Sequence, residues 1–222
     1  MKAKTSVRGP VPVLAAILIL ASGSSAQAQV TLGLRAGAMR GTLGVADEVG
    51  FVEGVSPRYG AQAAVSVAYP LNDLLGLVAE VGYAQRGADL TLLDIDVIYG
   101  ALWAYDYVDF SMLGKVFLGP AYLLAGPTVA LRTACYTRLT RPRGRATSSC
   151  EELEAVYREN DFLLTAGAGA GLDLGSATLV AEGLYGLGLL DINDSEDDVA
   201  ARHRGFALRI GVDFRLGRAR NR

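Results

Sequence analysis

The chain has 222 residues and a formal net charge of −2, so it is long enough for one domain and lacks the basic excess of a general nucleic-acid binder. Hydrophobic residues make up 51% of the sequence and glycine contributes 27 residues. Beyond residue 28, however, no stretch has the ~20 uninterrupted apolar residues that a membrane helix needs. This composition leaves two classes, a soluble all-β protein and a transmembrane β-barrel.

The first 28 residues have the three parts of a secretory signal peptide. A basic start is followed by an apolar run at residues 11–21, too short to span a bilayer, and by the small-residue cleavage motif Ala26-Gln27-Ala28. We therefore expect an exported mature chain of residues 29–222 that forms one domain in an oxidising compartment. Without the three basic residues of the leader, the mature chain has 18 basic and 23 acidic residues.

Eight segments of the mature chain alternate apolar residues with small or polar ones, as strands with two different faces do. In chain order they cover residues 30–41, 58–69, 75–83, 107–118, 121–132, 161–173, 177–190 and 205–216. The last is the clearest, because Leu208 and Ile210 alternate with Arg209. The fifth is nearly apolar on both faces, so its orientation stays open. Segments of about nine to twelve residues match tilted strands that cross a bilayer better than the shorter strands of soluble sandwiches.

The connections between these segments alternate strictly between short and long. Short turns lie at residues 70–73, 119–120 and 174–176, and the long connections are residues 41–57, 86–105, 133–160 and 190–203. All tight turns therefore fall at one end of the sheet, which is typical of outer-membrane barrels with short periplasmic turns and long external loops. A lipocalin-like soluble barrel, the alternative, would have its more apolar face inside.

The polar face predicts a filled lumen rather than a wet surface. It is rich in glycine, which leaves room for long side chains inside a narrow barrel, and it carries charges of both signs. We expect a lumen charge network of Glu80, Lys115, Glu182, Arg209, Asp213 and Arg215. Tyrosines near strand ends suggest interface girdles, although an ordinary strand residue is the better interpretation of any single one: Tyr59, Tyr69, Tyr83 and Tyr107. The expected fold is an all-β, eight-stranded antiparallel up-and-down transmembrane β-barrel.

Four stretches of the chain resemble the PorT-like family of small outer-membrane β-barrel proteins. They are "LGLRAGAM", "EVGYAQRGA", "YLLAGPTVAL" and "AEGLYGLGLLDI". The resemblance implies an outer-membrane barrel and, by analogy, a part in an export or assembly apparatus. Two places depart from the family pattern. Leu184 stands where such proteins often have an arginine, and the chain continues past Phe214 to "GRARNR" instead of ending on an aromatic residue.

Two cysteines and four arginines fall in one long connection. Cys135 and Cys150 predict a disulfide in an exported protein, since a metal pair would need nearby histidines. The arginines between them are a candidate docking patch for acidic lipopolysaccharide or another polyanion, or else a solvated charge run balanced by the glutamates that follow. They are Arg138, Arg141, Arg143 and Arg145.

Two other motifs carry no metal or cofactor prediction. The acidic loop of Asp191, Asp194, Glu196, Asp197 and Asp198 lacks the glycine that a calcium loop needs, and is expected to be an ordinary surface loop. The glycine run "GAGAGLDLG" precedes no helix and is therefore not a dinucleotide loop. We expect no cofactor.

We also expect no enzymatic activity, because no nucleophile, base and orienting group can be placed together. The lone histidine, His203, lies between two arginines and is expected to be exposed in the last loop. The expected role is structural or surface-interacting, through the external loops, in an outer membrane. The expected partners are outer-membrane lipid and, at the loops, lipopolysaccharide or a protein. The alternatives are a component of an export apparatus and a small-solute pore.

Overall fold

The computed structural model describes residues 29–45, 52–94, 97–141, 144–149, 158–191 and 201–216, and the predicted signal peptide lies outside these ranges. They form nine strands: β1 Val30–Val45, β2 Val52–Pro70, β3 Leu75–Asp94, β4 Val97–Leu118, β5 Ala121–Arg141, β6 Gly144–Ser149, β7 Asn160–Asp173, β8 Ala177–Gly188 and β9 Ala201–Leu216. Within these ranges no helix has the length and apolar character needed to cross a membrane.

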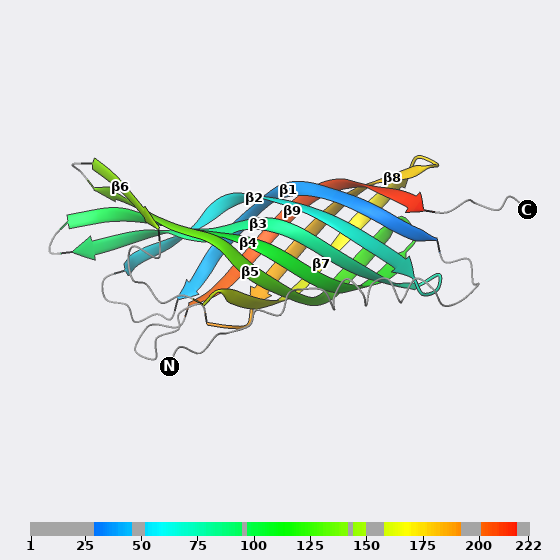
Figure 1. Ribbon diagram of the computed structural model, residues 1–222, viewed down its shortest axis with the longest axis horizontal. Helices are drawn as coiled ribbons and strands as arrows, with labels where there is room; N and C mark the ends of the chain where they lie inside the picture. The colour runs from blue at the N-terminus through cyan, green and yellow to red at the C-terminus, as the bar shows by residue number, and fades with distance from the viewer. Residues whose placement is uncertain are drawn as a thin grey trace, which may run out of the picture.

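Eight of the strands close into an antiparallel barrel, which confirms the predicted fold (Figure 1). The sheet order is β4-β3-β2-β1-β9-β8-β7-β5-β6, and pairing of β4 with β5 closes the ring and leaves β6 outside it. Following the register from Leu32 once around the barrel returns to β1 at Thr42, ten residues further along. This stagger tilts the strands and gives a lumen that side chains can fill.

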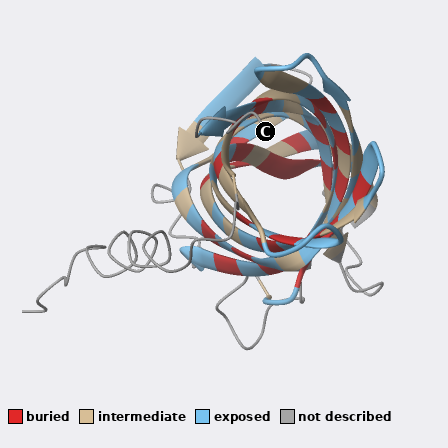
Figure 2. Cartoon of the chain, turned by 90° about the vertical axis from the view of Figure 1, so that its right-hand side faces the viewer, coloured by how far each residue is buried: buried red, intermediate tan, exposed pale blue. Residues whose placement is uncertain are grey.

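The two faces of the wall have opposite chemistry over its lower part, the end with the short turns. Outward side chains are large and apolar, with Leu34 49% and Ile210 72% exposed, whereas the inward Arg35 and Arg209 are buried. Figure 2 looks along the barrel and shows buried and exposed residues alternating within each strand. The undecided fifth segment turns Tyr122 and Leu124 inward and Leu123 outward.

The strands run well past the predicted segments, so the prediction of long external loops at residues 86–105 and 133–160 is wrong for most of these ranges. β3 and β4 remain paired up to Asp94 and Val97, and β5 continues to Arg141 and turns back as β6. Figure 1 shows this sheet projecting beyond the other strands. We call it the blade, and it consists of residues 88–94 of β3, 97–105 of β4, 134–141 of β5, and β6.

The apolar face changes sides along β3, which explains why the pattern concealed these extensions. Near the short turns Leu77 and Val81 point outward, but further up Ala88 and Leu90 are buried inside and Asp89 is exposed. The inner residues form an apolar core at that level, made of Leu43, Ala88, Tyr105, Tyr107, Ala130 and Leu163. The barrel is therefore built for lipid contact at one end and for water at the other.

Candidate functional site

Two buried arginines from neighbouring strands cross-link the lumen. Arg209 of β9 donates a hydrogen bond to Glu80 of β3 at 2.6 Å and another to Glu182 of β8. Arg35 of β1 donates to Asp213 at 2.6 Å and lies 3.3 Å from the Glu182 carboxylate. All five side chains are at most 11% exposed, so four strands are tied together by charge-assisted hydrogen bonds in a site away from bulk water.

Tyr122 and Lys115 complete this layer from the opposite wall. The Tyr122 hydroxyl donates to Glu182 at 2.6 Å. The Lys115 ammonium lies 3.6 Å from the centre of the Tyr122 ring and 5.1 Å from that of Phe117. We call the group of Arg35, Glu80, Tyr122, Glu182, Arg209 and Asp213 the ion-pair plug.

The plug differs from the predicted network at four residues, of which Tyr122 is an uncharged member that joins through its hydroxyl. Arg35 belongs to it although it was not among the predicted residues, and its inward parity opposite Leu34 was the available signal. Lys115 lies beside the plug and contacts aromatic rings. Arg215 does not join it, because its side chain is 38% exposed at the end with the short turns, where it pairs with Asp173. The hydrogen bond from Arg215 and that from the Gly175 N–H lower the pKa of the Asp173 carboxyl.

A second polar group lies further up the lumen, and it includes the histidine. His203 is 2% exposed, and its Nδ1 lies 3.0 Å from the buried Asp161 carboxylate. The rings of Tyr105 and Tyr107 make T-shaped contacts with the imidazole, with 5.5 Å between ring centroids in each pair. The expectation of an exposed loop histidine is therefore wrong, because β9 begins at Ala201 and carries His203 into the upper core.

Tyr107 also corrects the girdle prediction. It is 1% exposed and points inward, with the Arg86 guanidinium 4.9 Å from its ring centre. Arg86 is ion-paired with Asp109. Tyr59 and Tyr83, in contrast, are 74% and 38% exposed on the outer wall.

A small polar cavity of about 60 Å³ separates the two groups. Several of its lining atoms are buried and have no hydrogen-bond partner: Gln62 Nε2, Glu80 Oε2, Arg86 NH1, Asp109 Oδ1 and His203 Nε2. A space of this size and polarity suits a few water molecules. A cavity of this size is too small for an organic substrate. Between the plug and the short turns, a wider vestibule of about 590 Å³ is lined by Lys115, Phe117 and Tyr122 among others.

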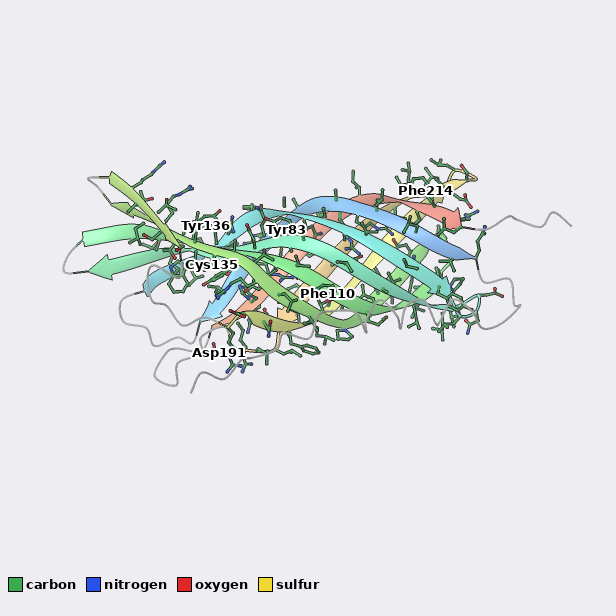
Figure 3. The ribbon with its side chains drawn as sticks, in the orientation of Figure 1. Tyr83, Phe110, Cys135, Tyr136, Asp191 and Phe214 are labelled. Carbon is green, nitrogen blue, oxygen red and sulfur yellow. The ribbon has the colours of Figure 1, made fainter. Side chains whose placement is uncertain are left out.

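Three of the four predicted loop arginines, Arg138, Arg141 and Arg145, lie on strands of the blade instead. Arg138 of β5 and Arg145 of β6 are exposed, the description of Arg141 is limited to its backbone, and Arg143 lies outside the described residues. Figure 3 shows Cys135 and Tyr136 on the projecting part of β5, and Phe110 and Phe214 on the barrel. Tyr136 accepts a hydrogen bond from Arg58 of β2 at 3.1 Å, which braces the base of the blade.

Two other predictions are only partly covered. Cys135 is half-buried and is not a free thiol, but Cys150 lies outside the described residues, so the disulfide between them stays a prediction. Asp191 follows β8 and is half-buried. Asp194, Glu196, Asp197 and Asp198 lie outside the described residues.

No family model and no curated protein matches this sequence, so the PorT-like resemblance finds no support. Among solved structures, the chain is similar to the attachment invasion locus protein Ail of Yersinia pestis, with 12% identity over 83% of this chain and 98% of that one and a TM-score of 0.42. It is also similar to the outer membrane protein OprG of Pseudomonas aeruginosa, with 12% identity over 86% of this chain and 97% of that one and a TM-score of 0.40. For the outer membrane protein AlkL in lipid bilayers, the identity is 12% over 100% of both chains, and the TM-score is 0.46. Identities and TM-scores this low carry no information about function.

Proposed function

We propose that this protein is a non-enzymatic outer-membrane barrel that anchors the blade at the cell surface. The outer wall supports the location, because a closed barrel with an apolar outside and a charged inside is stable only where its outside meets lipid. Export by a cleaved leader of residues 1–28 belongs to the same proposal. The short turns then face the periplasm and the blade faces outward.

The ion-pair plug carries the proposal. Its two arginines join strands from across the lumen, and moving either of them would leave a buried carboxylate, Glu80 or Asp213, without its ion pair. A lumen closed in this way argues against the small-solute pore. The cavity beside His203 is too small for an organic substrate, and this argues against catalysis there.

The blade is the part of the described structure that we propose binds a partner. Among the described strands, β6 pairs only with β5, so one edge of the blade is free to pair with an added strand. Arg138 and Arg145 are exposed there and favour an acidic partner. The predicted disulfide would hold this edge in place, and its support is the pairing of Tyr136 with Ser149, the chain neighbours of Cys135 and Cys150.

Three measurements test this function. In planar bilayers the refolded protein should give no steady, large, ion-selective current steps, and such steps would favour the pore.

On a column carrying a sulfated polysaccharide, the protein should be retained despite its acidic net charge, and the Arg138→Gln/Arg145→Gln variant should elute at lower salt. Equal elution of the two proteins would remove the blade arginines from the proposal. Recovery of secretion components with the native protein would favour the export alternative.

A further inference from the structure

Three arginines lie together on the outer wall, at the upper edge of the apolar surface. Arg40 of β1 and Arg202 and Arg204 of β9 are all exposed and share the outward parity of their strands. The register pairs Arg40 with Phe206, Thr42 with Arg204 and Gly44 with Arg202, so the three occupy adjacent positions on two paired strands. Within the described part of the chain, none of the three forms a hydrogen bond or an ion pair.

The wall below these arginines carries no outward charge on either strand. The outward residues are Leu32, Leu34, Ala36 and Ala38 on β1, and Phe206, Leu208, Ile210, Val212 and Phe214 on β9. Leu208 is 61% exposed and Ile210 is 72% exposed, which are large values for side chains of this kind. The three guanidinium groups therefore lie directly above the upper edge of the lipid-facing surface.

A shallow groove lies in this wall below the arginines. It has a volume of about 440 Å³, and its outer lining comes from the small residues Ala36, Ala181 and Gly183 beside the larger Leu208 and Ile210. The small residues belong to β1 and β8, which flank β9 on both sides. The groove is apolar and faces outward, so its natural occupant is a hydrocarbon chain.

The position of Gly44 fixes the direction of one arginine. A Cβ at residue 44 would lie 3.2 Å from Nε and 3.3 Å from Cζ of Arg204. The guanidinium of Arg204 therefore rests over Gly44, further from the apolar wall than its own Cα. This orientation suits a side chain that reaches into a headgroup layer.

We propose that the three arginines and the groove form a binding site for lipid A, the phosphorylated and acylated part of lipopolysaccharide. One acyl chain would lie in the groove, and the arginines would bind the phosphates, since guanidinium groups match phosphate oxygens in a bidentate geometry. This inference rests on the proposed function, in which the arginines lie on the external side of an outer membrane whose outer leaflet is lipopolysaccharide. Three clustered cations match a headgroup with two phosphates better than the single phosphate of a phospholipid.

Lipid A binding can be measured by native mass spectrometry of the refolded full-length protein in mild detergent. The Arg202→Gln/Arg204→Gln variant should bind diphosphorylated lipid A about tenfold more weakly than the parent protein, because it loses charge-assisted hydrogen bonds. The matched control is Arg138→Gln/Arg145→Gln, which removes the same charge from the blade and should bind lipid A like the parent. Lipid A without phosphates and phosphatidylglycerol should both bind more weakly than the diphosphorylated form.

A second variant tests the groove without changing charge. In Gly183→Val the new Cβ would lie 3.5 Å from the Phe206 ring, an ordinary contact, so the barrel should fold and keep its heat-modifiable migration on gels. Its affinity for lipid A should fall while its polysaccharide retention stays unchanged. Unchanged lipid A affinity in both variants would overturn the site, and equal affinity for phosphatidylglycerol would reduce it to a general anionic-lipid surface.

Discussion

At the scale of single residues, the protein depends on a few buried charges whose partners come from distant parts of the chain. Glu182 is the centre of this arrangement, because both plug arginines and the Tyr122 hydroxyl contact it. Removing one member of a buried ion pair leaves the other without compensation, and that loss exceeds what the intact pair contributes. The ion pair of Arg215 and Asp173 is exposed to solvent, so its loss should change the stability of the barrel little.

Replacing Arg209 by methionine should therefore destabilise the barrel strongly. The variant leaves the buried Glu80 without its ion pair and takes one of two arginines from Glu182, so the free energy of unfolding in urea should fall by about 3–5 kcal/mol. Arg215→Met is the matched control, and its effect should stay within about 1 kcal/mol. Similar losses in the two variants would mean that the plug is not a buried network.

His203 and Asp161 form the other residue-scale test. Asp161→Asn keeps the shape of the side chain but removes its charge beside the imidazole, and we expect a loss of about 1–3 kcal/mol in the free energy of unfolding. No esterase or acyl-transfer activity should appear in the parent protein. Activity that is present in the parent and absent from His203→Ala would contradict the structural role of this pair.

At the scale of elements, the strands have two different sections with opposite sidedness. β3 has apolar residues outside near Leu77 and inside near Leu90. The lower section is a membrane wall and the upper section is packed like a soluble barrel, so the blade does not depend on lipid for its shape. The tight turns at the lower end include glycines with positive φ, Gly119 and Gly175, where a side chain would be strained.

Trimming the blade should leave the barrel intact. Leu90 and Ala101 are register partners, as are Thr137 and Ser148, so each pair can be joined by an Asn-Gly turn after removal of the residues between them. The trimmed protein should refold with heat-modifiable migration and should lose its retention on the polysaccharide column. Failure to fold would show that the blade is part of the folding unit, and unchanged retention would place the binding surface elsewhere.

The predicted disulfide is tested at the same scale. Titration of the unreduced, unfolded protein should find no free thiol, and a Cys135→Ser/Cys150→Ser variant should lose about 3 kcal/mol of stability in the chain-entropy account. The loss should appear in protease resistance of the blade. Two free thiols in the unreduced protein would rule the disulfide out.

At the scale of the whole molecule, the sequence predicts the membrane barrel well and its external part poorly. In lipid, the outward side chains of a barrel must be apolar, so they alternate along each strand with polar or small inward ones. This alternation predicts the eight segments, the short turns between them and the faces of most strands. That rule stops at the upper edge of the apolar wall. Beyond it, Ala88, Leu90 and Tyr105 reverse the alternation, and the prediction therefore mistook strands for loops.

The errors in the candidate site have other causes. His203 was expected in an exposed loop because it lies between two arginines, and Tyr107 was expected in an interface girdle because it lies near a strand end, whereas both are buried in the upper core. Arg35 shares the inward parity of the predicted members, but parity alone did not show its pairing with Asp213 and Glu182, which are distant in sequence. Such pairing depends on barrel register, which single-strand patterns do not contain.

The sidedness of the lower wall is the central claim, and solid-state NMR in lipid bilayers tests it most directly without substitutions. Magnetisation from lipid acyl-chain protons should reach the methyl groups of Leu164, Leu208 and Ile210, which are 49%, 61% and 72% exposed. It should not reach Leu113, Leu163 or Leu184, which are at most 7% exposed inside the barrel. Transfer to the second set and not to the first would contradict the lipid-facing wall and the sealed, ion-paired lumen together.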